Sequence, residues 1–231
     1  MMREFDALAG YPEPNARRLV NKYLRTIKQR IVATERGYDF FDGDRCYGYG
    51  GYRYDGRWIP IVENMCCTYE LDSSSKVLQI GSEKGFLLHD FLIVRPGIQV
   101  TGVEASSYAR KNTMKEVQSF VVDAPYVDLP FAEGTFDFVL ALGPIYTLNL
   151  EDAIRCLKEI QRVGRGKSFV TLGSYMYEED YWLFRHWTLL GTTILQPDEW
   201  KAVLEHVGYT GDYKFTGATS LHLQWDSELS K

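Results

Sequence analysis

The sequence predicts an α/β protein in which helices cover both faces of a mostly parallel sheet. From Lys76 onward, short apolar runs alternate with stretches of helical periodicity, which is the pattern of such a sheet. A glycine turn follows the first apolar run and an acidic residue ends the second, as in sheets that bind a nucleotide. The 231 residues, 45% of them hydrophobic, suffice for one core with an extension. We therefore expect a sheet domain over residues 76–231 and an N-terminal extension over residues 1–75.

Seven strands are expected in the sheet domain. Five follow one another, at residues 77–80, 99–103, 119–122, 136–142 and 168–172. A terminal pair follows at residues 213–215 and 221–225. Helices are expected between or after the strands, at residues 84–94, 106–116, 151–163 and 197–206.

The extension is expected to be helical on either side of a segment rich in tyrosine and glycine. An apolar stripe predicts a helix over residues 14–36, with Pro14 in its first turn and Gly37 as its exit. Its basic side chains are expected to form a solvated face, and they are Arg17, Arg18, Lys22, Arg25, Lys28 and Arg30. A second helix is expected over about residues 59–71. Residues 38–58 are too glycine-rich for a helix and too aromatic for a disordered linker.

The loop after the first apolar run indicates a ligand site. Residues 77–80 suit a buried strand, and Gly81 and Gly85 let the backbone turn sharply before a helix begins. Glu104, about twenty residues later, ends a second apolar run where a carboxylate could accept both hydroxyls of a ribose. A dinucleotide site would require glycine at position 83, because Glu83 would repel a pyrophosphate. S-adenosylmethionine, which is cationic and lacks phosphate, is compatible with Glu83, and a junction without ligand is the remaining interpretation.

Further motifs follow this loop in an order that is specific as a set. The glycine turn at residues 79–85 is followed by Val122-Asp123-Ala124, by Leu129-Pro130-Phe131, and by Gly134-Thr135-Phe136-Asp137 before an apolar run that ends at Tyr146. Over about residues 76–225 these segments resemble the class I S-adenosylmethionine-dependent methyltransferases, which have a seven-stranded Rossmann-like fold. Two positions depart from the family pattern, since Gln79 replaces the usual first acid and Glu83 the usual middle glycine.

The resemblance implies that S-adenosylmethionine is the cofactor. Its implied contacts come from the glycine turn, the acid after the second strand, the Asp-Ala segment and the end of the fourth strand. These residues are Gln79, Gly81, Ser82, Glu83, Gly85, Glu104, Ala105, Asp123, Ala124, Leu142 and Gly143. In the family, the aspartate that corresponds to Asp123 hydrogen-bonds the adenine amino group. Either Gln79 or Glu83 is expected to hold the methionine ammonium.

The tyrosine-rich segment from Tyr47 to Trp58 is the candidate acceptor site and a possible lid. It resembles a segment of methyltransferase-like proteins associated with bacterial surface polysaccharide biosynthesis, which implies a sugar or a sugar-derived substrate. Tyrosine rings offer rigid apolar faces with a hydroxyl at the tip, and arginine binds carboxylate or phosphate through two parallel bonds. The candidate substrate-binding residues are Tyr52, Arg53, Tyr54 and Arg57. The alternative is a packed flap in which Arg57 pairs with Asp55 or Asp42.

Two residues are candidates for catalysis. Methyl transfer requires the acceptor to be aligned with the methyl group and, for a hydroxyl acceptor, the removal of a proton. His186 follows the fifth strand, where a neutral imidazole could take that proton, and Tyr146 follows the fourth. Competing candidates are Glu178, Glu179 and Asp180. The other histidines, His89, His206 and His222, are expected at surface positions.

Composition favours a cytoplasmic protein that acts on small molecules. The net charge of −5 is spread without long blocks of like charge, which disfavours general attraction to nucleic acid or to an anionic membrane. The four cysteines lack zinc-ligand spacing, so neither a metal nor a disulfide framework is expected, and the adjacent Cys66 and Cys67 are expected to be buried. No signal peptide or membrane span is expected.

The leading hypothesis is therefore methylation of an oxygen on a sugar, a nucleotide-sugar or a related metabolite, with nitrogen acceptors equally compatible with the cofactor site. A non-catalytic binding or scaffold protein is the alternative that the altered glycine motif suggests. A nucleic-acid methyltransferase is a third hypothesis, which the acidic charge balance disfavours.

Overall fold

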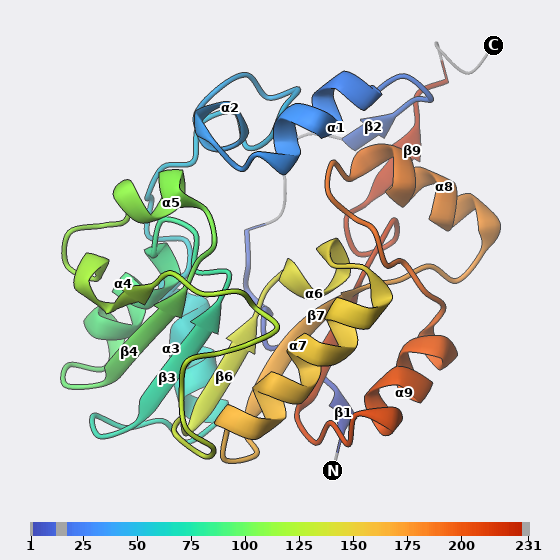
Figure 1. Ribbon diagram of the computed structural model, residues 1–231. Coiled ribbons are helices and arrows are strands. Elements are labelled where there is room, and N and C mark those ends of the chain that lie inside the picture. Colours follow the sequence, from blue (N-terminus) through green and yellow to red (C-terminus); the bar gives the residue numbers. More distant parts are fainter. Residues whose placement is uncertain (1, 13–17, 228–231) are drawn as a thin grey trace.

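The computed structural model describes residues 2–12 and 18–227, and in this part of the chain a seven-stranded sheet forms the centre (Figure 1). Its strands are β1 (Arg3–Glu4), β3 (Lys76–Ile80), β4 (Gln99–Val103), β5 (Val121–Val122), β6 (Phe138–Ala141), β7 (Ser168–Gly173) and β8 (Asp212–Thr216). They lie in the order β1-β8-β7-β6-β3-β4-β5. Every pair is parallel. The predicted α/β fold with a parallel seven-stranded sheet is confirmed.

The strand order reverses between β3 and β6. From β5 to β8 the order is that of a doubly wound nucleotide-binding sheet, in which the crevice for a ligand opens beside the carboxyl ends of the two strands at the reversal. The loops that follow β3 and β6 therefore meet at the place where a ligand is expected.

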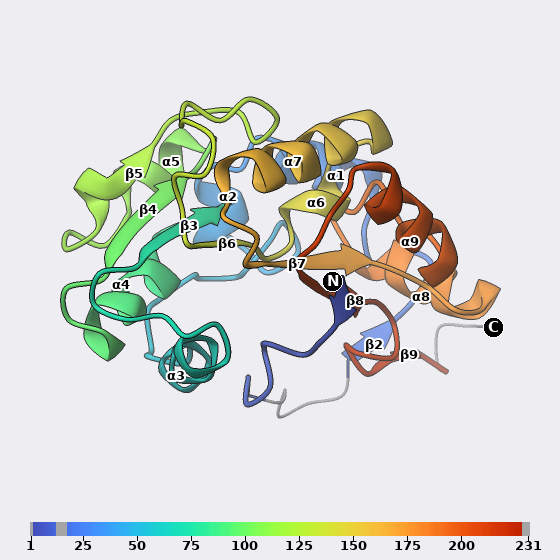
Figure 2. The same ribbon diagram turned by 90° about the horizontal axis from the view of Figure 1, so that it is seen from below.

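Helices cover both faces of the sheet (Figure 2). On one face lie α3 (Ile59–Thr68) and α4 (Phe86–Val94), whose apolar side chains pack against Val77, Phe138 and Phe169. On the other face lie α7 (Leu150–Val163) and α9 (Pro197–His206). Because the central strands are buried on both sides, they read as continuous apolar runs in the sequence.

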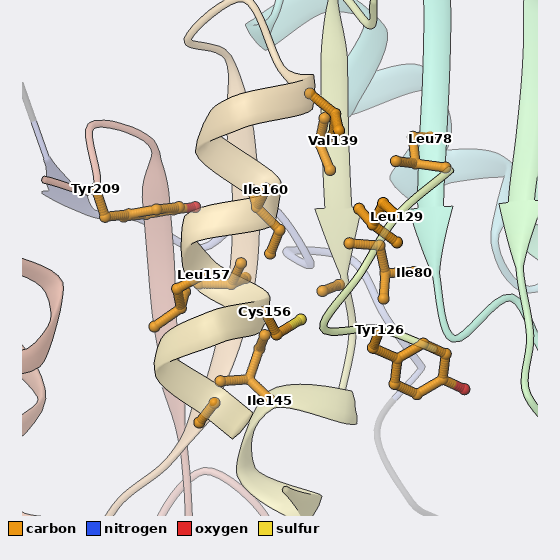
Figure 3. Close-up of a cluster of buried hydrophobic side chains, with 14 of the residues drawn as sticks. Leu78, Ile80, Tyr126, Leu129, Val139, Ile145, Cys156, Leu157, Ile160 and Tyr209 are labelled. Carbon is orange, nitrogen blue, oxygen red and sulfur yellow. The ribbon is translucent and has the colours of Figure 1, made fainter. Parts of the chain in front are cut away.

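Helix α7 forms the centre of the larger core cluster. Figure 3 shows Cys156 and Ile160 of this helix directed toward Val139, with Leu78 and Ile80 of β3 beside them. All five side chains are buried. The helix is strongly amphipathic because its apolar residues recur at positions 153, 156, 157, 160 and 163, which lie along one face.

One of the two terminal strands was assigned to the wrong sheet. The predicted strand at 221–225 is β9 (Leu223–Trp225), and it pairs with β2 (Arg18–Val20) in a separate two-stranded sheet. The seventh place in the central sheet belongs to β1, where Arg3 forms a bidentate ion pair with Asp212 at 2.7 and 3.0 Å. A two-residue strand has no alternation to reveal it, so the sequence pattern could not predict β1.

The predicted helix over 14–36 is also wrong. Residues 14–17, Arg17 among them, lie outside the described residues, β2 occupies 18–20, and the helix α1 spans only Ile27–Thr34. It begins at a capping box in which Thr26 and Gln29 bond each other's backbone N–H groups. Two of the predicted solvated side chains, Arg25 and Arg30, instead turn inward and donate hydrogen bonds to backbone carbonyls.

Smaller differences concern helix lengths and single side chains. The helix expected at 106–116 is the short α5 (Ser107–Lys111), and α8 (Glu178–Trp187) was not expected as a helix. Residues 38–58 contain one short helix, α2 (Tyr38–Phe41), followed by turns. Cys66 is buried as predicted, but Cys67 is exposed. His89 is half-buried beside Asp90 instead of lying on the surface.

In the described part of the chain, no helix combines the length and the apolar character that crossing a membrane requires.

A largely buried ion pair fastens the tyrosine-rich segment to the sheet domain. The Lys84 Nζ atom lies 2.6 and 2.7 Å from the two carboxylate oxygens of Asp42 and donates a further bond to the Tyr52 carbonyl. Asp42 also accepts a hydrogen bond from the Tyr108 hydroxyl at 2.6 Å. Burial alone would raise the pKa of Asp42, but the bonds from Lys84 and Tyr108 outweigh it and lower the pKa. The ion pair therefore holds the turn after α2 against the glycine loop.

We expect Asp42→Ala to lower the free energy of unfolding by about 3 kcal/mol, because it leaves the Lys84 ammonium buried without a counter-charge. Urea denaturation at neutral pH measures the change. The matched control is Asp55→Ala, which removes an ion pair whose side chains are 44% and 49% exposed and should cost less than about 1 kcal/mol. Because the folded pKa of Asp42 is lowered, its contribution is complete above about pH 4 and is lost as the pH falls further. Equal losses in the two variants would contradict this role.

Candidate active site

A cavity of about 280 Å³ lies at the carboxyl ends of β3, β6 and β8. We refer to it as the central cavity. Its floor comes from the loop after β3, with Gly81 and Glu83, and from the segment after β6, residues 142–147. The extension and the segment around the end of α8 close it, through Arg36, Tyr49 and residues 187–190. It therefore occupies the crevice that the strand order predicts for a ligand.

The loop after β3 has positive φ angles at both of its glycines and also at Glu83, where the family pattern has glycine. Gly81 and Gly85 have φ angles of +71° and +76°, and a Cβ atom on Gly85 would lie 2.7 Å from Val117. Glu83, at the position of the missing middle glycine, also has a positive φ, of +51°. A left-handed conformation at a residue other than glycine is strained and is found mainly at functional sites. The loop is thus built as the resemblance implies, with a carboxylate added to it.

The Glu83 carboxylate faces the central cavity. It accepts a hydrogen bond of 2.5 Å from the Tyr49 hydroxyl, and the Tyr49 ring stacks on Tyr52 at 4.4 Å between centroids. Burial raises the pKa of Glu83, although Tyr49, Tyr52 and Arg36 act in the opposite direction. The Glu83 carboxylate beside these rings suits a cationic ligand group, whereas Arg25, Arg36 and Arg45, which also line the central cavity, suit an anionic one.

Glu104 braces the same loop from below. It is fully buried, and its Oε2 atom accepts a hydrogen bond from the Glu83 N–H at 2.9 Å. The Oε1 atom accepts from the Ser106 N–H at 2.7 Å and from the Tyr126 hydroxyl at 3.3 Å. The Ser106 hydroxyl in turn donates to the Arg36 carbonyl. The position predicted to bind a ribose is therefore covered by residue 36 and its neighbours.

The predicted cofactor residues fall into three groups. Those that line the central cavity are Gly81, Glu83, Leu142 and Gly143. Those that are buried behind it or beneath its loop are Gln79, Ser82, Gly85, Glu104 and Ala124. Two are exposed, Ala105 and Asp123, and the latter forms an ion pair with Arg110 at 2.5 Å. The structure thus brings four of the predicted residues, Glu83 among them, together in one cavity, and leaves Glu104 and Asp123, predicted for the ribose and the adenine, outside its lining.

Two polar atoms near this loop bear on whether the cofactor fits. The amide oxygen of Gln79 and the Nε atom of Arg36 are buried and have no hydrogen-bond partner in the described part of the chain. An ammonium group would suit the first atom and a carboxylate the second, and the methionine end of S-adenosylmethionine carries both. The residues around the loop therefore fit that end of the cofactor.

Arg36 and Tyr49 are site residues that the sequence did not reveal. Arg36 follows α1 with a φ of +46°, and its guanidinium lies near Glu83, Glu104 and Tyr126. Burial acts to lower the Arg36 pKa, but the neighbouring acidic groups outweigh it and raise the pKa. Tyr49 lies within the segment expected as a lid, yet nothing in its spacing distinguished it from the other tyrosines. Both reach the site through tertiary packing alone.

Of the two catalytic candidates, the structure places Tyr146 in the central cavity and His186 outside it. Tyr146 lies on α6 (Pro144–Thr147), and burial raises its pKa, so the hydroxyl stays protonated near neutral pH. His186 lies on α8 beside Trp182 and Trp225, in a separate shallow cavity. Burial and the nearby Arg30 and Arg185 lower its pKa. The structure thus does not bring His186 into the central cavity, because α8 carries it to another one, and its catalytic role stays a prediction.

The competing acids also lie apart from the central cavity. Glu178 and Glu179 are exposed at the start of α8, and Asp180 bonds the Tyr177 N–H as part of a helix cap. None of the three lines the central cavity as the described residues form it.

The four predicted substrate-binding residues line a second cavity of about 330 Å³, which we name the aromatic cavity. Its walls include Tyr52, Tyr54, Trp58 and Phe86. The central and aromatic cavities share Arg45 and Tyr49 as lining residues, so they adjoin.

The two predicted arginines of the aromatic cavity differ in charge environment. Arg57 forms a bidentate pair with Asp55, with 2.8 Å from Nε and 2.5 Å from Nη2, as the packed-flap alternative anticipated. Arg53 is exposed and has no ion pair among the described residues. Uncompensated positive charge in the aromatic cavity therefore centres on Arg53 more than on Arg57.

Comparisons with known proteins agree with this geometry. Residues 78–171 match the protein-family model described as a methyltransferase domain, and they include β3 to β7 and the glycine loop. No curated protein matches the sequence significantly.

Solved structures share the fold at low sequence identity. The YcgJ protein from Bacillus subtilis is similar with a TM-score of 0.53 and 19% identity, over 63% of this chain and 66% of that chain. A putative methyltransferase from Bacillus halodurans C-125 has a TM-score of 0.51 and 13% identity, over 64% of this chain and 68% of its own. The mitomycin 7-O-methyltransferase MmcR has a TM-score of 0.50 and 15% identity, over 66% of this chain and only 50% of its own. Residues 78–171 therefore match a methyltransferase domain, the solved structures share the Rossmann-like fold, and the match implies S-adenosylmethionine as the cofactor.

Proposed function

We propose that this protein transfers the methyl group of S-adenosylmethionine to a small molecule, by O-methylation of a sugar, a nucleotide-sugar or a related metabolite. The observation that carries the proposal is the central cavity, where Glu83 and Tyr49 meet at the strand reversal and the aromatic cavity adjoins. In this proposal residues 76–231 form the catalytic domain, and residues 1–75 form an extension that adds β1 and α3 to it and closes over its cavities with residues 36–58. The four unpaired cysteines favour the cytoplasm as its compartment.

The chain's own residues would hold the cofactor by its two ends. Glu83 and the buried Gln79 amide oxygen would face the ammonium group, and the Arg36 guanidinium would face the carboxylate. Glu104 and Asp123 are proposed for the ribose and the adenine. Because Glu104 is fully buried, the residues that cover it would have to move aside before a ribose could reach it. The cofactor supplies a methyl group that is activated by a sulfonium charge.

The aromatic cavity is proposed to hold the acceptor. Tyr52 and Tyr54 offer rigid faces on which a sugar ring can lie, and Arg53 can bind a carboxylate or phosphate group. Arg57 contributes less, because Asp55 already occupies its guanidinium. An acceptor that reaches past Tyr49 enters the central cavity, where the protonated Tyr146 hydroxyl can orient it. Exclusion of water and alignment then supply most of the rate enhancement.

A non-catalytic binding protein is the second candidate function. The complete burial of Glu104 favours a binding protein, because a site in which the ribose cannot reach Glu104 would bind S-adenosylmethionine poorly. Incubation of the protein and S-adenosylmethionine with a metabolite extract separates the two, since only an enzyme releases S-adenosylhomocysteine above the protein-free rate.

Isothermal titration calorimetry should show binding of both S-adenosylmethionine and S-adenosylhomocysteine. We expect Glu104→Ala to weaken both by roughly tenfold to a hundredfold, since a lost charge-assisted bond costs about 1.5–3 kcal/mol. The exposed Glu133→Ala is the control and should bind as the parent does. Absence of binding by protein that circular dichroism shows to be folded would remove the enzymatic proposal, and unchanged affinity in Glu104→Ala would place the ribose elsewhere.

Glu83→Gln should weaken S-adenosylmethionine binding by roughly tenfold to a hundredfold, because the ammonium loses its counter-charge. Methylthioadenosine, which lacks the amino-acid end, should bind the variant and the parent equally. Since burial raises the Glu83 pKa, the parent's affinity for S-adenosylmethionine should fall on acidification through that raised pKa, and the variant should lack this dependence. If methylthioadenosine is weakened as much as S-adenosylmethionine, Glu83 does not face the ammonium.

Once an acceptor is in hand, Tyr146→Phe should lower kcat by about tenfold, the cost of one hydrogen bond of roughly 1–1.5 kcal/mol to the acceptor. His186→Ala should leave kcat within about twofold of the parent, because His186 lies outside the central cavity. Steady-state kinetics with saturating cofactor distinguishes the two. A large loss confined to His186→Ala would restore the histidine as the base and would mean that α8 moves during the reaction.

A further inference from the structure

A third cavity, of about 380 Å³, lies between α1, α8 and the loop that follows α8. We name it the arginine cavity, because Arg30, Arg36 and Arg185 line it. Its other lining residues are Thr34, Thr147 and residues 189–192, which carry no charge. No acidic residue lines it within the part of the chain that the structure describes. The cavity therefore gathers three arginines, of which only Arg36 has acidic groups nearby, Glu83 and Glu104.

Arg30 is fixed in place by the backbone. Its Nη1 atom donates to the carbonyls of Thr188 and Leu189, and its Nη2 atom donates to the carbonyl of Arg185 at 2.7 Å. Burial, Arg185 and Arg25 lower its pKa to about 10, so Arg30 remains charged at neutral pH. The positive charge at this wall is thus held rigidly and close to a second one.

Arg185 and Arg36 each have a buried N–H donor without a hydrogen-bond partner among the described residues. The Nη1 atom of Arg185 and the Nε atom of Arg36 are buried and have no acceptor among the described residues. Neither side chain, nor that of Arg30, takes part in any ion pair that the described residues form. Buried charged donors without partners are costly, and like charges that face one cavity repel each other. Such an arrangement is stabilised when an anion enters.

We propose that the arginine cavity binds an oxyanion, a phosphate or a group like it, either free or as part of a larger ligand. Guanidinium groups bind the oxygens of phosphate through paired hydrogen bonds, and they are suited to buried sites because they are weakly hydrated. The aromatic cavity also contains arginines, Arg53 among them, but Arg185 lines the arginine cavity and not the aromatic one, so a variant of Arg185 tests the arginine cavity alone. The proposal does not rest on methyl transfer, because only charge and burial support it.

The position of the arginine cavity connects it with the active site. It shares Arg36, Thr147, Leu189 and Leu190 with the central cavity. A ligand whose phosphate lies beside Arg185 can therefore extend toward Tyr146. A free anion at the same place would instead hold α1 against α8 and so fix the cover of the central cavity.

The test is calorimetry with inorganic phosphate and with uridine diphosphate, in chloride buffer at constant ionic strength. The parent protein should bind both, and Arg185→Gln should weaken both by at least tenfold. Arg185→Lys keeps the positive charge but not the paired donors, so its affinity for both ligands should lie between those of the parent and of Arg185→Gln. The control is Arg155→Gln on the exposed side of α7, where the side chain is 52% exposed, and it should bind as the parent does.

The outcomes show whether the anion site exists and whether it takes a free anion or the phosphate of a larger ligand. Uridine diphosphate that binds at least tenfold more tightly than phosphate supports a site for part of a larger ligand, and equal affinities support a site for a free anion. Failure of both probes to bind the parent would overturn the proposal, as would equal binding by the parent and by Arg185→Gln. S-adenosylhomocysteine titrated into Arg185→Gln shows separately whether the cofactor site survives.

Discussion

The ion pair between Asp42 and Lys84 is the constraint on which the site depends. Lys84 belongs to the glycine loop of the sheet domain, whereas Asp42 belongs to the extension, so the pair joins two parts of the chain that local sequence does not connect. Through it, the turn after α2 is held where Tyr49 can reach Glu83 and where Tyr52 can stack on Phe86. A buried pair of this kind contributes more to the choice of one arrangement than to net stability. Here the ion pair favours the arrangement in which the turn after α2 is closed over the glycine loop.

The glycine loop after β3 has a left-handed residue at position 83, but that residue is a glutamate and adds a carboxylate to the loop. Glu83 adopts the left-handed conformation at a cost of about 1–3 kcal/mol, which its backbone bond to Glu104 and its side-chain bond to Tyr49 offset. The same contacts make Glu104 a structural brace as well as a proposed ribose ligand. The negative charge of this loop lies on Glu83 at the tip of the turn, and the strand end carries the neutral Gln79. The cofactor's amino-acid end would meet that charge from a different side.

The sequence predicted those features that depend on local pattern. The strand at residues 99–103 and the helix at 197–206 have the predicted bounds, because a buried strand reads as an apolar run and because Gln196, Pro197 and Glu199 mark a helix start. The strands β1 and β2 could not be predicted, since each is only two or three residues long and depends on a partner near the other end of the chain. Arg36 was not recognised as a site residue, because it too reaches the site through contacts with residues distant in the sequence. The helix over 14–36 failed because an apolar stripe there reflects exposed side chains, among them Tyr23, Ile27 and Ile31, and not a buried face.

The pairing of β2 with β9 has a consequence for the order in which the molecule can assemble. Arg18 of β2 lies opposite Leu223, and Arg3 of β1 pairs with Asp212, so both strands close loops of about two hundred residues. Contacts so distant along the chain form late, whereas the strands from β3 to β7 pair with near neighbours and α4 and α7 pack on them locally. The strands β3 to β7 can therefore pair, and the Asp42–Lys84 pair can form, before residues 212–225 are available to fix β1 and β2.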